Sequence, residues 1–185
     1  MFGPSGANRH KTLIGADRDA TRTDMSIERL TADDRDLVRA ATAAIEPQYK
    51  PGKRRTARTV GAALRTADGS VYTGVNLTTD TPRASVCAEP VALGAATADG
   101  HTAFETVVAV LYAPENEPEF EGDESDPPER RVISACGVCR ELLRDYDPDV
   151  DVIVDGEPHG IDAPIKRPVT ELLPELTWRG GTPPS

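Results

Sequence analysis

Two short cysteine motifs constrain this chain more than any other feature of its sequence. The first is Cys87-Ala88-Glu89-Pro90, and the second is Cys136-Gly137-Val138-Cys139. Proline is disfavoured inside a helix but suits its first turn, where the missing N–H had no partner to lose. Pro90 therefore predicts that a helix begins beside Cys87. The second motif also precedes a predicted helix, so each motif is expected at a helix N-terminus.

The residue types of the motifs predict a zinc site with Cys87, Cys136 and Cys139 as ligands. Three cysteines cannot all pair within one chain, and in a reducing cytoplasm metal binding or catalysis explains them better than disulfides. A helix N-terminus favours the thiolate, which is the form that binds zinc. Three protein ligands leave the fourth position for water, as in catalytic zinc sites, whereas structural sites usually close with four.

Glu89 is the predicted general acid–base of this site. Zinc makes its bound water more acidic, but thiolates donate charge to the metal and weaken this effect, so a nearby base is needed. A first-turn carboxylate that merely suits the helix dipole is the alternative. Arg140, next to Cys139, is expected to offset the negative charge of a zinc ion held by three thiolates, or else to be a surface or interface cation.

These motifs resemble the cytidine deaminase family, in which Cys-Ala-Glu opens one helix and Pro-Cys-Gly-x-Cys-Arg opens another. The resemblance runs from about Thr31 to Trp178 and includes Gly-Val-Asn at 74–76 and Glu-Leu-Leu-Pro at 171–174. It implies an α/β fold, a three-layer α/β/α sandwich around a five-stranded mixed sheet. It also implies a homotetramer or homodimer that removes the amine of cytidine or deoxycytidine hydrolytically, with Zn²⁺ and a glutamate that is not a ligand, in pyrimidine salvage.

Substrate recognition departs from that family. Its members carry Asn-x-Glu after the second strand to hold the ribose hydroxyls; Asn76 matches the Asn and is the predicted substrate-binding residue, but Thr78 replaces the Glu. Ala135 also replaces the usual Pro. These changes resemble the blasticidin-S deaminase branch, so a cytosine nucleoside analogue is the alternative substrate. A non-catalytic, zinc-stabilised binding module is the alternative from another class.

The domain organisation is predicted from periodicity and composition. Residues 1–30 are expected to be a disordered extension, with Met25 as an alternative start; residues 31–179 form the domain, 114–131 an acidic loop insertion and 180–185 a tail. Apolar spacing predicts the following elements: helices at 32–46, 87–99, 136–146 and 168–173, and strands at 60–64, 71–75, 106–112 and 150–154.

Charge and hydropathy exclude several classes of partner. A net charge of -10 argues against nucleic acid, which is bound by clustered Lys and Arg. No apolar run is long enough for a bilayer, and no secretory signal opens the chain, so a cytoplasmic enzyme acting on a small molecule is expected. His10, His101 and His159 are interpreted as solvated residues; a fourth ligand from His101 would make the zinc site structural.

Overall fold

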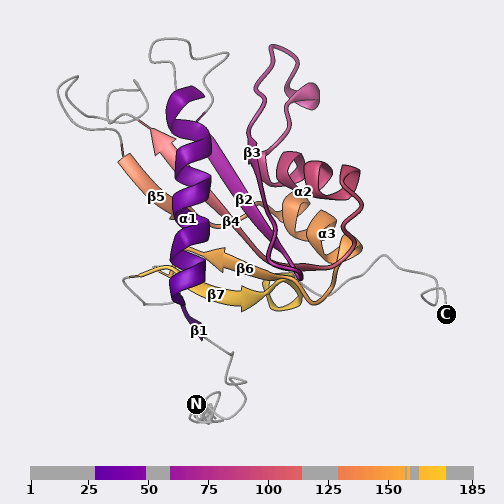
Figure 1. Ribbon diagram of the computed structural model, residues 1–185. Coiled ribbons are helices and arrows are strands. Elements are labelled where there is room, and N and C mark those ends of the chain that lie inside the picture. The colour runs from indigo at the N-terminus through magenta and orange to yellow at the C-terminus, as the bar shows by residue number, and fades with distance from the viewer. Residues whose placement is uncertain (1–27, 49–58, 114–128, 157, 159–162, 174–185) are drawn as a thin grey trace, which may run out of the picture.

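A mixed β-sheet separates helix α1 on one face from helices α2 and α3 on the other (Figure 1). The computed structural model describes residues 28–48, 59–113, 129–156, 158 and 163–173. None of the described helices has both the length and the apolar character needed to span a bilayer. The α-helices and strands, in chain order, are β1 Glu28–Arg29, α1 Ala32–Ile45, β2 Val60–Thr66, β3 Val71–Val75, α2 Ala88–Ala98, β4 Phe104–Ala113, β5 Glu129–Ile133, α3 Gly137–Tyr146, β6 Asp151–Val154 and β7 Ile165–Pro168.

The ten-residue strand β4 organises the sheet, whose strand order is β1-β7-β6-β4-β2-β3 with β5 paired to β4. The first part of β4 pairs with β6 in parallel, and the second part pairs with β5 in antiparallel register. Strand β2 pairs with both β3 and β4. The predicted α/β sandwich with a mixed sheet is confirmed, but the described residues form a sheet of seven strands where five were expected.

Alternation along β2 distributes the core between the two faces. Ala62 and Leu64 belong to the apolar cluster that contains α2 and α3, whereas Ala63 belongs to the cluster that contains α1. This is the period of two that a strand buried on both faces requires.

Two glycines allow the helices to approach the sheet closely. A Cβ at Gly61 would lie 2.2 Å from the carbonyl oxygen of Ala41 in α1. A Cβ at Gly74 would lie 2.5 Å from the carbonyl oxygen of Ala88 in α2. Since the first turn of α2 carries the first cysteine motif, Gly74 sets how near that motif comes to the sheet.

Helix α1 begins as its sequence predicts. Thr31 and Asp34 form a capping box, in which each side chain accepts a hydrogen bond from the other residue's backbone N–H. Leu37, Ala41 and Ile45 are buried along one stripe of the helix.

Three boundaries differ from the sequence-based expectations. The short helix predicted at 168–173 is found as a 3₁₀ helix over Val169–Leu172, because Pro168 is the last residue of β7. Glu28–Arg29 lies in β1, inside the predicted disordered extension, and pairs with β7. The last residues of the predicted acidic insertion, 129–131, belong to β5. The rest of that insertion, the rest of the extension and the 180–185 tail lie outside the described residues.

Candidate zinc and active site

The two cysteine motifs meet at the N-termini of α2 and α3, as the sequence predicts. Cys87 is the N-cap of α2, Cys136 is the N-cap of α3, and Cys139 lies in the first turn of α3. The Sγ atoms of Cys87 and Cys136 are 4.0 Å apart, and those of Cys136 and Cys139 are 3.5 Å apart. All three Sγ atoms lie within 4.8 Å of one another.

These distances fit a single zinc ion. Zn–S bonds of ~2.3 Å in tetrahedral geometry place the sulfur atoms about 3.8 Å apart. The Cys87–Cys136 and Cys136–Cys139 sulfur separations lie on either side of that value. Within the part of the chain that the structure describes, the group of candidate metal ligands consists of the three cysteines, so the donor set is that of a site with one open position.

Local hydrogen bonding distinguishes the thiols. Burial opposes ionisation of Cys136, but hydrogen bonds from the backbone N–H groups of Cys139 and Val138, and from the neighbouring thiols, lower its pKa. Burial and the nearby negative charge of Glu89 instead raise the pKa values of Cys87 and Cys139. A divalent cation among the three sulfurs acts in the opposite direction, because it favours the thiolate.

Glu89 lies beside the sulfur cluster and is only 4% exposed. Burial raises the pKa of its carboxyl group, while hydrogen bonds from its own backbone N–H and from the thiol of Cys139 oppose this shift. Its carboxylate oxygens are not members of the ligand group around the sulfurs. A buried carboxylate with a raised pKa, next to but outside a ligand set, is suited to proton transfer.

A cavity of about 250 Å³ opens beside the cysteines and Glu89. Among its described lining residues, Glu89 is the one with a charged side chain. Ser85 and Ser134 contribute hydroxyl-bearing residues that sequence reasoning missed, because a serine in a loop carries no signal by itself. The full lining is Val60, Asn76, Leu77, Thr78, Ser85, Val86, Cys87, Ala88, Glu89, Ile133, Ser134 and Cys136.

One side of this cavity is a loop closed at its base. The backbone N–H of Leu77 donates to the carbonyl of Val86 at 2.8 Å, and the N–H of Val86 donates to the carbonyl of Leu77 at 2.9 Å. Residues 78–85 lie between these two points, and Cys87 follows directly. The paired backbone bonds therefore fix both ends of the loop next to Cys87.

Asn76 lines the cavity, but most of its hydrogen bonding is to the protein. Its Oδ1 accepts hydrogen bonds from the backbone N–H groups of Thr59 and Val60, each at 3.0 Å. Its Nδ2 donates to Oγ1 of Thr78 at 3.2 Å. The side chain therefore fixes the start of β2 and orients Thr78, and its amide nitrogen is the end with capacity for a further donor bond.

Arg140 is placed by backbone carbonyls. Its Nε donates to the carbonyl oxygen of Ala135 at 2.7 Å, and its Nη1 donates to that of Leu172 at 2.9 Å. These bonds join the loop before Cys136 to the 3₁₀ helix that follows β7.

Of the three histidines, His101 lies beyond the other end of α2, where its Nδ1 is 3.7 Å from Oδ2 of Asp68. His10 and His159 lie outside the described residues.

Comparisons with known proteins agree with the geometry. No protein-family model matches the chain. A blasticidin-S deaminase of Bacillus cereus is 36% identical over 147 residues, which cover 78% of this chain and 92% of the relative. A probable cytidine deaminase of Dictyostelium discoideum is 32% identical over 83 residues, covering 45% of this chain and 46% of the relative.

Solved structures of cytidine deaminases have the same fold. The enzyme from Burkholderia pseudomallei superposes with a TM-score of 0.55 at 27% identity, covering 79% of this chain and 98% of that chain. The enzyme from Bacillus anthracis gives a TM-score of 0.57 at 26% identity, covering 77% and 88%.

Proposed function

The chain belongs to the cytidine deaminase family, and we propose that it hydrolyses the exocyclic C–N bond of a free cytosine nucleoside, releasing ammonia and the uracil nucleoside. The observation that carries this proposal is the meeting of three thiols at two helix N-termini beside one buried carboxylate.

Each residue of the site then has a chemical task. Cys87, Cys136 and Cys139 would hold the zinc ion, which supplies an activated water when it is bound. Glu89 takes a proton from the attacking water and transfers it to the ring nitrogen N3; it then takes the proton of the hydroxyl group added at C4 and delivers it to the amine, which leaves as ammonia. The raised pKa of Glu89 supports this role, because the group must hold a proton during part of the cycle.

Two substrate classes are candidates for this cavity. Cytidine or deoxycytidine, in pyrimidine salvage, is the first, with Asn76 Nδ2 donating to a sugar hydroxyl. A cytosine nucleoside analogue of the blasticidin-S type is the second; the Bacillus cereus relative and Thr78, in the place of a carboxylate, favour it. The reaction at the cytosine ring is the same for the two substrate classes, and they differ in how the protein would bind the sugar.

Substituting Glu89→Gln tests the catalytic proposal. We expect bound zinc to be retained and kcat to fall about 10²–10⁴-fold, since the amide cannot transfer protons. Zinc is measured by inductively coupled plasma mass spectrometry, and deamination by the loss of ultraviolet absorbance. A parent protein that binds zinc but deaminates no cytosine compound would instead identify a zinc-stabilised binding module.

A substrate panel separates the two classes. Cytidine, deoxycytidine, cytosine and blasticidin S are compared by kcat/KM under one set of conditions. Turnover of the antibiotic alone would exclude pyrimidine salvage, and turnover of the two natural nucleosides alone would exclude the analogue.

We further infer a cytoplasmic homodimer or homotetramer. Leu77, Val86 and Val138 are exposed apolar residues close to the cysteine site, and Val138 is 77% exposed. A second subunit that covers them would remove this apolar surface from water. Light scattering of the purified protein measures the subunit number.

A further inference from the structure

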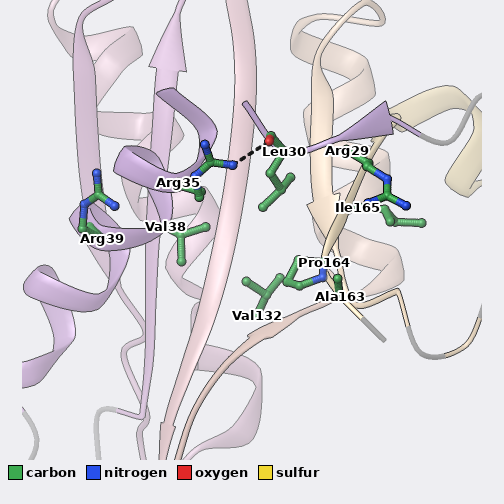
Figure 2. Close-up of a pocket in the computed structure, with 9 residues that line it drawn as sticks. All are labelled: Arg29, Leu30, Arg35, Val38, Arg39, Val132, Ala163, Pro164 and Ile165. Atoms are coloured by element: carbon green, nitrogen blue, oxygen red, sulfur yellow. Dashed lines mark hydrogen bonds between the residues drawn. The ribbon is translucent and has the colours of Figure 1, made fainter. Parts of the chain in front are cut away.

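A second cavity lies on the α1 face of the sheet, away from the cysteines (Figure 2). Its volume is about 780 Å³, and it contains none of the residues of the cysteine site. Helix α1, β1, β5 and the start of β7 contribute to it. Its apolar lining residues are Leu30, Val38, Val132, Ala163, Pro164 and Ile165.

Three arginines surround this apolar lining. Arg29, Arg35 and Arg39 are exposed, and Figure 2 shows Arg29 and Arg35 on either side of Leu30. Nη1 of Arg35 donates to the carbonyl of Leu30 at 2.8 Å, and Arg39 forms an ion pair with Asp36. For Arg29 there is no ionic partner among the described residues. We call this site the arginine-lined cavity.

The lining is complementary to an anionic peptide that also carries an apolar side chain. Guanidinium groups pair with carboxylates, and the apolar residues between them favour a hydrophobic group. The chain itself contains such a peptide. Residues 114–128 include seven acidic residues, no basic residue and one aromatic residue, Phe120. They account for seven of the ten net negative charges of the whole chain.

The position of this acidic segment in the chain places it within reach. The segment ends directly before the first residue of β5, and Val132 of β5 is one of the residues that form the arginine-lined cavity. The nine residue-to-residue steps from Phe120 to Glu129 can span up to ~30 Å when the chain is extended. A short tether of this kind gives an effective concentration in the millimolar range, so weak contacts are enough for binding.

We propose that the acidic segment, residues 114–128, binds in the arginine-lined cavity of its own chain. Its carboxylates pair with Arg29, Arg35 and Arg39, and Phe120 packs against the apolar lining between them. The interaction is independent of the deamination chemistry, because the arginine-lined cavity and the cysteine site share no residue.

Limited digestion of the full-length protein by a glutamate-specific endoproteinase tests this proposal. Bound residues resist cleavage in proportion to the population of the bound state when opening and closing are fast. Arg29→Glu combined with Arg39→Glu should accelerate cleavage within 114–128 about tenfold. Phe120→Ser should accelerate cleavage of this segment in the same way. The control is Arg83→Glu, which reverses the charge of an exposed arginine outside the cavity lining. This variant should leave the cleavage rate unchanged.

A free synthetic peptide of residues 114–128 provides the unprotected reference rate. Slower cleavage in the parent protein than in the peptide, and loss of that protection as salt is raised, support the proposal even if the double variant folds poorly. Cleavage of the parent at the peptide's rate overturns it. Protection that grows with protein concentration also overturns it, because the segment would then bind to a second copy.

Discussion

Asp34 is a buried carboxylate on which three polar contacts converge. Its side chain has no exposed surface. Oδ1 accepts a hydrogen bond from Nη2 of Arg65 at 2.9 Å, Oδ2 accepts one from the backbone N–H of Thr31 at 3.0 Å, and Nζ of Lys166 is 3.6 Å away. Burial alone would raise the pKa of Asp34, but these hydrogen bonds and the charge of Lys166 lower it overall.

Replacing Asp34 with Asn should therefore cost stability in a pH-dependent way. At pH 7 we expect a loss of about 3 kcal/mol, at the low end for a broken buried pair because Arg65 keeps Glu105 as a partner. A carboxyl whose folded-state pKa is lowered stabilises the fold above its unfolded pKa of about 3.9, and this contribution disappears as the pH falls through the folded value. Urea unfolding at pH 7 and pH 3 measures the difference, which should narrow in acid.

Asp36→Asn is the matched control, because Asp36 lies two residues further along the same helix in an exposed pair with Arg39. Its effect should stay within ~0.5 kcal/mol at both pH values. A pH-independent penalty for the Asp34 variant would contradict the ionic account and point to packing alone.

At the scale of elements, the position of α2 depends on Gly74 in β3. A methyl group there would lie 2.5 Å from the carbonyl oxygen of Ala88 and 2.6 Å from the backbone nitrogen of Ala92, and neither backbone atom can move without the helix. Displacing α2 moves Cys87 away from the two cysteines of α3.

Gly74→Ala should therefore weaken zinc binding as well as the fold. We expect a loss of about 2 kcal/mol or more in stability and at least a tenfold loss in zinc affinity. Gly94→Ala is the control in α2 itself, where nothing lies within 4 Å of the added methyl group, so a gain of ~0.5–1 kcal/mol is expected. Equal zinc affinity in the two variants, measured by competition with a chromophoric chelator, would contradict this account.

Local signals explain which elements the sequence predicts correctly. The capping box at Thr31, the proline in the first turn of α2 and the alternation in β2 are each formed by neighbouring residues, and each is found in the structure. Strand β1 has two residues and exists through pairing with β7, whose paired residues lie 136 or more positions away in the sequence, so no local pattern indicates it. Pairing with β6 likewise makes a strand of residues 165–168, most of which were assigned to no element from the sequence.

The same distinction applies to the candidate site. The cysteines and Glu89 could be predicted from the motifs, because both motifs lie at the start of a helix. The hydrogen bonds of Asn76 to Thr59 and Val60, and those of Arg140 to Ala135 and Leu172, join segments that no local pattern connects. Their contribution to holding the site together emerges from the fold.

For the whole molecule, zinc would act as a cross-link. The three thiols join the N-termini of α2 and α3, two helices that pack side by side on one face of the sheet. A ligand that binds the folded state alone stabilises it by RT ln(1 + [L]/Kd), which is about 4 kcal/mol at a thousandfold excess over Kd.

Removing the metal with a chelator should accordingly lower Tm. For a chain of this size we expect a decrease of about 8–16 °C, since 1 kcal/mol corresponds to ~2–4 °C. Scanning calorimetry with and without chelator measures it, and re-addition of zinc should restore the original Tm. In a Cys139→Ser variant the chelator should change Tm little; an unchanged Tm in the parent protein would mean that the cysteines hold no stabilising ion.

The backbone pairing of Leu77 with Val86 has a consequence for redesign. Because both ends of residues 78–85 are anchored at one point, this stretch is a cassette that can be exchanged without disturbing Cys87. It contains Thr78 and Ser85, two of the side chains nearest the cavity. Grafting equivalent stretches from other deaminases would thus alter which sugars the enzyme accepts while the reaction at the base stays the same.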